Sequence, residues 1–415
     1  MKYAIVITIL FLSHPLSSQD LIYARLVVDT LSTPSMCGRG YVNDGDKKAA
    51  RFINDEFENF GLLPFGDSYF QLFTLPMNTY PGEIHVEVDK NPLSPGDQFV
   101  ILPYSPSVSG TFDLVFAMAD SLGNIKFPEG IGNMNVKKKV LVTDINQRDF
   151  KVNPNYLFAG YVFLQKDKVW WHVSDGHSVE RYFALQILEE AINKKAKTIK
   201  IRAKNNFVKN YPTQNVIGYI KGKMNPEQFV VFSAHYDHLG QMGNDIYFPG
   251  ANDNASGTAM LLNLAHHYSK PENQPECSLA FMAFSAEEAG LLGSGYYVRN
   301  PLFPLNQIRF LINLDMVGSG SEGIKVVNGS VFEKEFERLF QLNNDYGYLT
   351  DVKTRGKAAN SDHYPFFVNG VPSFFIYTLG DESKEYHSIY DTPENVPFTE
   401  YEDLFRLLTD FAKTF

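Results

Sequence analysis

Three apolar runs in the middle of the chain each end at acidic or imidazole side chains. Residues 229–234 lead into His235-Tyr236-Asp237, residues 279–284 lead into Ser285-Ala286-Glu287-Glu288, and residues 308–314 lead into Asp315. Uninterrupted apolar runs of this length, bounded by turn residues, are typical of parallel strands buried on both faces. Ligands of such sheets bind at the carboxyl ends of the strands. The pattern therefore predicts polar side chains gathered at one edge of a mostly parallel sheet.

Strand and helix patterns alternate from residue 215 to residue 415. Strand character at 215–220 and 371–377 alternates with helical spacing at 331–343 and 400–411, and Asn360-Ser361-Asp362-His363 opens another short helix. Residues 250–257 form a turn before a helix that starts near Ser256. This alternation predicts an α/β domain in which helices sandwich the sheet.

The first part of the chain carries two amphipathic helical patterns, at 20–31 and 46–60, and the second of these stops at Gly61. A strand is expected at 69–75, ending at Pro76. We assign residues 20–83 to the N-terminal part of the α/β domain, which continues at 205–415.

Between these parts, residues 84–204 show short alternating runs separated by Pro and Gly, which predicts a β-rich inserted domain. Within it, a serine-capped helix is expected at 178–193 and a closing strand at 198–202. Trp170 and Trp171 also lie in this segment, where packing in a core is the favoured role and contact with a substrate cleft the alternative.

Hydrophobic residues make up 44% of the 415 residues, a share that is typical of globular proteins. The net charge is −10 and no basic block occurs, which disfavours nucleic acid as a partner. Residues 1–19 combine an early lysine, a short apolar run and small polar residues, which predicts a signal peptide and export to the periplasm or the exterior. The run is too short to span a bilayer. Nothing in the sequence indicates an oligomeric state.

Two cysteines, Cys37 and Cys277, are too few for a four-sulfur metal site, so a bound metal would take nitrogen and oxygen ligands. Their separation leaves a disulfide open, and a buried free thiol is the favoured interpretation of Cys277.

The residues that end the apolar runs have the chemistry of metal ligands. His235 and Asp237 lie two apart at a strand end and leave the strand on the same face, so that Asp237 can hold the second ring nitrogen of His235. Asp253 precedes a helix for which its neighbours already offer capping groups, which frees its carboxylate to bridge two cations. Each motif alone also fits an ordinary loop.

Three further motifs complete the set. Glu287 and Glu288 are adjacent at a strand end, so one can bind a metal while the other takes a proton from water. Asp315 ends a buried run, where an unpaired acid is costly. His387 has Asp391 four residues on as a possible orienting carboxylate. Together these residues predict two divalent cations that share a carboxylate and activate a water, with zinc favoured and manganese or cobalt possible.

The same motifs resemble the M28 family of co-catalytic zinc peptidases. The resemblance rests on Ser233-Ala234-His235-Tyr236-Asp237, residues 250–257, Ala286-Glu287-Glu288-Ala289-Gly290, residues 313–318 and Tyr386-His387, in the family's order. The turn Gly38-Arg39-Gly40 resembles the N-terminal part of that family, and the insert resembles a protease-associated domain.

The resemblance implies a role for each candidate residue. One zinc would be held by His235, Asp253 and Asp315, and the other by Asp253, Glu288 and His387. Glu287 would act as general base and acid, Asp237 would orient His235, and Tyr386 would polarise the scissile carbonyl. The implied activity is that of an aminopeptidase acting on peptides.

Three alternatives stay open at this point: a carboxypeptidase, a glutaminyl cyclase with a single zinc, and a binding domain without catalysis. The glycine-rich stretch 318–323 lacks the Lys-Ser/Thr of a phosphate loop. His266, His267 and His363 are assigned structural roles.

Overall fold

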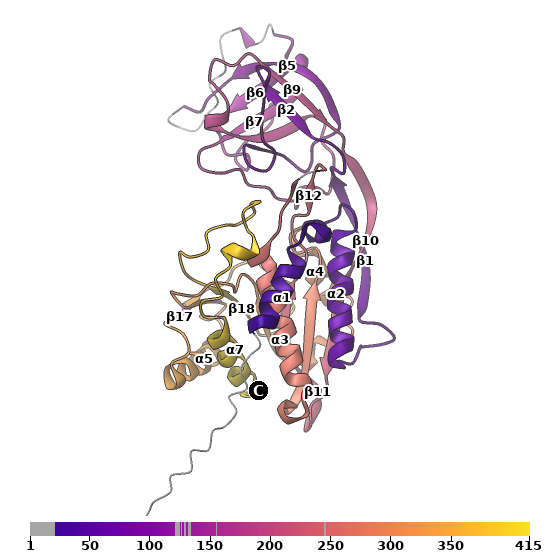
Figure 1. Ribbon diagram of the computed structural model, residues 1–415, viewed down its shortest axis with the longest axis vertical. Helices are drawn as coiled ribbons and strands as arrows, with labels where there is room; N and C mark the ends of the chain where they lie inside the picture. The colour runs from indigo at the N-terminus through magenta and orange to yellow at the C-terminus, as the bar shows by residue number, and fades with distance from the viewer. Residues whose placement is uncertain are drawn as a thin grey trace, which may run out of the picture.

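The computed structural model describes residues 21–120, 125, 127, 130–131, 134–154, 156–244 and 246–415. The predicted signal peptide, residues 1–19, lies outside the described residues. Figure 1 shows two sheets one above the other, joined by the long strands β1 and β10. The helices are α1 (Leu21–Leu31), α2 (Gly45–Phe60), α3 (Gly257–Ser269), α4 (Leu292–Arg299), α5 (Glu333–Tyr346), α6 (His363–Val368) and α7 (Tyr401–Ala412).

The lower sheet has eight strands and a parallel centre. In spatial order its strands are β1 (Phe70–Thr79), β10 (Asn206–Ile220), β14 (Cys277–Phe284), β11 (Asn225–His235), β15 (Ile308–Leu314), β18 (Ser373–Thr378), β16 (Ile324–Val327) and β17 (Val352–Arg355). β14, β11, β15 and β18 run parallel, whereas the pairs β1–β10, β10–β14 and β16–β18 are antiparallel, and β17 runs parallel to β16. The central strands therefore deliver their carboxyl ends to one edge.

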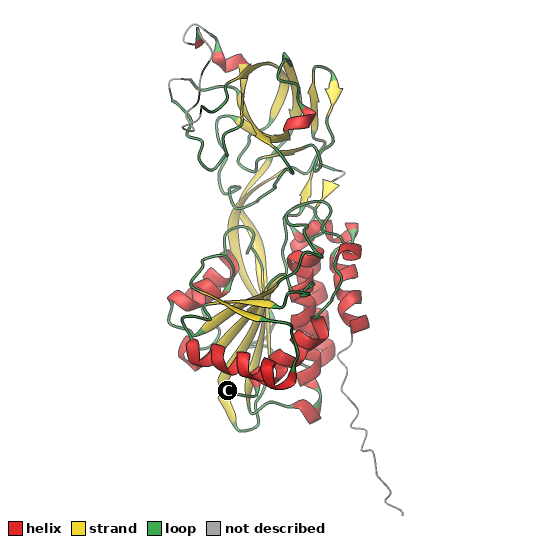
Figure 2. Ribbon diagram, turned by 90° about the vertical axis from the view of Figure 1, so that its left-hand side faces the viewer, coloured by secondary structure: helices red, strands yellow, loops and turns green. Residues whose placement is uncertain are grey.

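Helices cover both faces of this sheet, as Figure 2 shows. Val230 and Phe232 of β11 face a core shared with α1, α2, α3 and α7, whereas Val231 faces the core that contains Tyr297 of α4 and Phe366 of α6. Because side chains alternate along a strand, a strand buried on both sides must be apolar at every position. The predicted α/β sandwich is confirmed.

The upper sheet is a curled β-structure formed entirely between β1 and β10 (Figure 2). Its strands, in spatial order, are β3 (Asn91–Pro92), β2 (His85–Val88), β9 (Thr198–Ala203), β5 (Val108–Phe116), β6 (Lys139–Thr143), β7 (Gly160–Gln165), β8 (Phe183–Leu188) and β4 (Phe99–Ile101). A small hairpin of β12 (Gln241–Met242) and β13 (Ile246–Tyr247) lies between the two sheets. We call the β-rich part the insert.

Two sequence predictions for these segments are wrong. The helix expected at 178–193 is the strand β8, which is buried at all six positions and pairs parallel with β7. A short, mostly apolar run such as Phe183–Leu188 does not by itself distinguish a buried strand from a buried helix. The strand expected to end at Pro76 continues to Thr79, because β1 has a register irregularity between Leu75 and Met77 that accommodates the proline.

The two tryptophans of the insert have different environments. Trp171 is buried in the core of the insert and donates its ring N–H to the carbonyl of Ile101, whereas Trp170 is half-buried and faces Tyr386. Cys37 and Cys277 are both buried free thiols.

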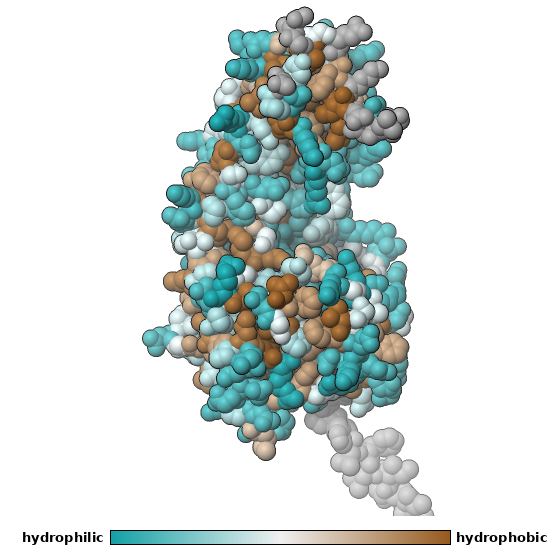
Figure 3. Space-filling model, turned by 180° about the vertical axis from the view of Figure 1, so that it is seen from behind, coloured by the Kyte–Doolittle hydropathy of each residue, from teal (hydrophilic) through white to brown (hydrophobic). Residues whose placement is uncertain are grey.

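Within the described part of the chain, no helix has the length and apolar character needed to cross a membrane. Figure 3 shows a surface of mixed hydropathy whose outline is indented between the two sheets.

Candidate active site

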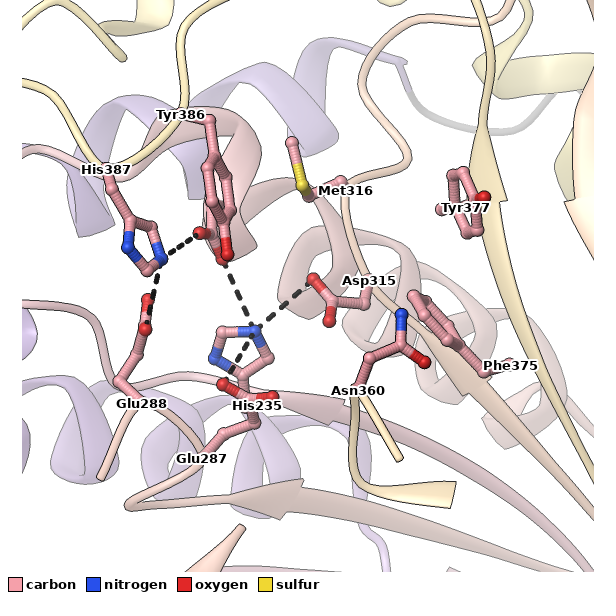
Figure 4. A pocket seen from close by; sticks show the side chains of 11 residues that line it. His235, Glu287, Glu288, Asp315, Met316, Asn360, Phe375, Tyr377, Tyr386 and His387 are labelled. Atoms are coloured by element: carbon pink, nitrogen blue, oxygen red, sulfur yellow. Dashed lines mark hydrogen bonds and ion pairs between the residues drawn. The ribbon is translucent and has the colours of Figure 1, made fainter. Parts of the chain in front are cut away.

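One cavity of about 170 Å³ collects the predicted ligands at the carboxyl edge of the lower sheet (Figure 4). Its lining residues are His235, Asp253, Glu287, Glu288, Asp315, Met316, Asn360, Phe375, Tyr377, Tyr386 and His387. The lining includes all five predicted metal ligands together with Glu287 and Tyr386. The parallel register explains the convergence, because β11, β14 and β15 end side by side.

The first group of converging atoms contains His235, Asp253 and Asp315. His235 Nε2 lies 3.4 Å from Asp253 Oδ1. It also lies 3.3 Å from Asp315 Oδ1, a contact that Figure 4 shows. All three side chains are buried and offer atoms within 4.8 Å of one another, which suits a single cation.

The second group shares Asp253 with the first. His387 Nε2 lies 3.2 Å from Asp253 Oδ2 and 3.1 Å from Glu288 Oε2. His238, Asp253 and Glu288 also converge as a possible metal group. The two oxygens of Asp253 therefore face different histidines, His235 and His387, as a bridging carboxylate would.

His238 was missed in the sequence. It is fully buried, its Nδ1 lies 2.8 Å from Glu288 Oε1, and its Nε2 has no hydrogen-bond partner among the described residues. The signal is the position of His238 directly after His235-Tyr236-Asp237, which places a further imidazole at the same strand end.

The charges of the cavity favour bound cations. Burial, reinforced by Glu288 and Asp315, raises the pKa of Glu287 well above its usual range. Burial opposes protonation of His387, yet Glu288 and Asp253 raise its pKa to about 10. Burial also opposes ionisation of Glu288, but His387 lowers its pKa to about 2. The clustered carboxylates thus hold positive charge strongly, and mixed imidazole and carboxylate donors fit zinc.

The loop that carries Asp253 is held by buried polar contacts. Residues Ala251–Ser256 form a π-type turn before α3. The Asp391 carboxylate accepts the main-chain N–H groups of Asn252 and Asp253, at 2.8 and 3.0 Å. Asp391 was expected to orient His387, but His387 Nδ1 instead lies 3.1 Å from Nδ1 of His172, a residue of the insert.

Arg39 ties the N-terminal segment to both ligand loops. Its guanidinium is fully buried and donates to five main-chain carbonyls at 2.6–3.2 Å, those of Leu31, Tyr236, Pro249, Gly250 and Asp253. These contacts use all five guanidinium N–H groups. Gly38 and Gly40 allow this placement, because a Cβ on either would lie 2.5 Å or less from Gly240. Arg39 thus holds the backbone directly after His235 and the segment that leads up to and includes Asp253.

Replacing Arg39 with Met is expected to lower the free energy of unfolding by at least ~3 kcal/mol, because each buried carbonyl left without a donor costs about 1–3 kcal/mol. Urea denaturation followed by circular dichroism measures this loss. Arg39→Lys should fall between Met and wild type, since an ammonium keeps the charge but offers only three donors. Equal stability of the Met variant and the wild type would contradict this role.

Asp237 lies close to His235, but its carboxylate is not the nearest partner of the ring. His235 Nδ1 is 3.1 Å from the main-chain oxygen of Asp237 and 3.8 Å from its carboxylate. The carboxylate instead accepts the main-chain N–H of Glu287 at 3.1 Å. Asp237 thereby links the loop of the first metal group to the proposed base.

Tyr386 forms a wall of the cavity. Its ring stacks on that of His387 at a centroid distance of 3.9 Å, and burial together with Asp253 and Glu288 raises its pKa well above the usual value. Trp170 of the insert meets Tyr386 edge-on at 5.8 Å. The insert therefore contributes side chains that touch the site, and for Trp170 the alternative role, contact with the cleft, fits the structure better than packing in a core.

The histidines assigned structural roles lie outside the metal groups. His266 stacks on Phe60 and His267 packs against Phe405. His363 is buried against Phe375, which lines the cavity. In the stretch 318–323, the N–H groups of Gly320 and Ser321 donate to Glu382.

Comparisons with known proteins agree with this geometry. Residues 215–412 match the family model of peptidase family M28. The chain is 31% identical over 213 residues to the aminopeptidase YwaD of Bacillus subtilis (strain 168), an alignment that covers 50% of this chain and 44% of that protein. The chain thus spans less than half the length of the curated relatives first matched.

Solved structures resemble nearly the whole chain. BSAP, a zinc aminopeptidase from Bacillus subtilis, aligns over 94% of this chain and 93% of its own, with a TM-score of 0.68 and 20% identity. A peptidase M28 precursor from Shewanella amazonensis SB2B aligns over 95% and 92%, with a TM-score of 0.71 and 18% identity. At these identities the likeness shows the fold. Taken with the family match and the two buried metal groups, it shows that residues 215–412 form an M28-like peptidase region in a chain with the zinc aminopeptidase fold.

Proposed function

We propose that the protein is a zinc-dependent aminopeptidase that uses two metal ions. The observation that carries the proposal is the shared carboxylate of Asp253 between two buried histidine–acid groups, with Glu287 beside them. The described lining of the cavity contains acids but no lysine or arginine. A cavity lined by carboxylates suits the free amine of a peptide better than its carboxylate.

The position of each residue in the cavity indicates its role in peptide hydrolysis. Two zinc ions, when bound, polarise the scissile carbonyl and lower the pKa of a water. His235 and Asp315 would hold one ion, Glu288 and His387 the other, with Asp253 between them. The Glu287 carboxylate, 4.0 Å from His235 Nε2, would take the proton of the attacking water and return it to the leaving amine. Tyr386 would donate a hydrogen bond from its hydroxyl to the scissile carbonyl oxygen and so polarise it, and Asp237 would hold Glu287 through its main chain.

Met316, Phe375 and Tyr377 line the same cavity and lie away from His387 in Figure 4. These largely apolar side chains offer a surface for the N-terminal side chain of the substrate. The proposed enzyme therefore favours peptides that begin with an apolar residue.

Two other reactions are compatible with the fold. A carboxypeptidase would need a cation for the substrate carboxylate close to the metals, and a glutaminyl cyclase would use one metal. The described cavity lining lacks the cation, and both metal groups are complete, so neither alternative is favoured.

One assay separates these activities. The purified protein is incubated with free and N-acetylated peptides, with and without a chelator, and the products are identified by mass. Release of N-terminal residues from free peptides only, abolished by chelator and restored by zinc, is the expected result. Cleavage of acetylated peptides from the carboxyl end would show a carboxypeptidase, and cyclisation of N-terminal glutamine with one zinc per chain would show a cyclase.

We also propose export, because residues 1–19 have the composition of a signal peptide. Expression of the full chain in a bacterium, followed by fractionation and N-terminal sequencing, tests this. The expected mature protein lies outside the cytoplasm and results from cleavage near Ser18 or Gln19. An intact Met1 on the mature protein would rule it out.

A further inference from the structure

A second hollow, of about 410 Å³, adjoins the catalytic cavity on the side of the insert. Its lining includes Gln147, Arg148, Trp170 and His172 of the insert, together with Tyr386. Tyr386 also lines the catalytic cavity, so the two spaces meet at its ring.

Direct contacts between residues of the insert and residues of the catalytic cavity fix the position of the hollow beside the metal groups. His172 Nδ1 lies 3.1 Å from Nδ1 of His387, and Trp170 packs edge-on against Tyr386. Lys168 covers the ring of Trp170 and donates to the main-chain oxygen of Lys384. The position of the insert therefore sets the distance between this hollow and the reacting atoms.

The two spaces carry opposite charge. Arg148 is the one fully charged side chain in the described lining of the hollow, whereas the catalytic cavity is lined by four carboxylates. Arg148 is exposed, its Nη2 lies 3.5 Å from His172 Nε2, and among the described residues it forms no ion pair with a carboxylate. A zwitterionic peptide with its amine at the metals and its carboxylate at Arg148 would match this polarity.

The spacing limits the length of such a peptide. A single imidazole ring, that of His172, separates His387 from the Arg148 guanidinium. Since an extended chain spans at most ~3.3–3.6 Å per residue, a carboxylate one or two residues beyond the scissile bond reaches Arg148.

We propose that this hollow is the subsite for the leaving part of a short peptide, and that Arg148 binds its C-terminal carboxylate. The inference rests on the proposed peptidase function and deepens it: the preferred substrates are dipeptides and tripeptides with a free carboxylate. Guanidinium and carboxylate form two parallel hydrogen bonds, which an uncharged C-terminal amide does not reproduce. Arg148 touches no reacting atom, so its effect falls mainly on KM.

The test compares kcat/KM for pairs of peptides that differ only at the C-terminus, as free acid or as amide. The pairs have two, three and five residues and begin with whichever residue is released fastest. Wild type is expected to prefer the acid by ~10-fold or more for two or three residues, the range of a charged hydrogen bond, and to lose this preference at five. Arg148→Gln should bring the acid-to-amide ratio close to one, and Arg148→Lys should retain part of it.

Arg202→Gln is the matched control, because Arg202 is an exposed arginine of the insert that pairs with Glu83. It should keep the wild-type ratio. Hydrolysis of acids and amides at equal rates by wild type, or an unchanged ratio in Arg148→Gln, would overturn the subsite alone. Absence of hydrolysis of every peptide by the zinc-loaded protein would overturn the peptidase proposal and the subsite together.

Discussion

Replacing Glu287 with Gln is expected to lower kcat by at least ~100-fold, because a neutral amide cannot accept the proton of the attacking water. Gln has nearly the same shape, and Glu287 belongs to neither of the two metal groups. The variant should therefore bind zinc as wild type does. The measurement is kcat on the fastest peptide, with metal content determined on the same sample.

Glu276→Gln is the control for this change, since Glu276 is an exposed glutamate at the opposite end of β14. It should leave kcat and metal content unaltered. A Glu287→Gln enzyme with full activity would remove Glu287 from proton transfer. An inactive variant that has also lost zinc would place Glu287 among the ligands.

Replacing Asp253 with Ala is expected to abolish binding of both metal ions, because its two oxygens serve two separate groups. Asp315 belongs to only one group, so Asp315→Ala should lose one ion and keep the other. Metal per chain after dialysis, determined by elemental analysis, distinguishes the two variants. Both should be inactive, which makes metal content the informative measurement.

If Asp253→Ala retained as much metal per chain as Asp315→Ala, or more, the bridging role of Asp253 would be contradicted. If Asp253→Ala kept one ion per chain, the second group would have to be completed by His238, Glu288 and His387 alone. Circular dichroism must first show that both variants are folded, since the Asp253 loop packs against Arg39 and Asp391.

The sheet and most of the site were predictable because they depend on local pattern. Apolar runs that stop at His235, Glu287 and Asp315 mark strand ends, and parallel strands bring their ends together. The resemblance to the M28 family supplied the pairing of ligands, which the spacing of residues alone left open.

Features that depend on contacts between distant segments were not predictable. Nothing near Arg39 in the sequence indicates that its guanidinium reaches carbonyls more than 190 positions away. The contact of His172 with His387 requires the placement of the insert above the sheet. The strand β8 occupies a segment for which the sequence predicts a helix, because all six of its positions are buried and show no alternation of the kind that marks a half-buried strand.

The buried guanidinium of Arg39 has a practical consequence for protein production. The region that matches the family model starts at residue 215, yet the backbone around its metal ligands is held by a side chain 176 positions earlier. A shortened clone that begins at the family boundary would leave those oxygens without donors. Expression trials and deletion libraries should therefore keep the helix–turn segment from Leu21 onward, even when the insert is excised and replaced by a linker between β1 and β10.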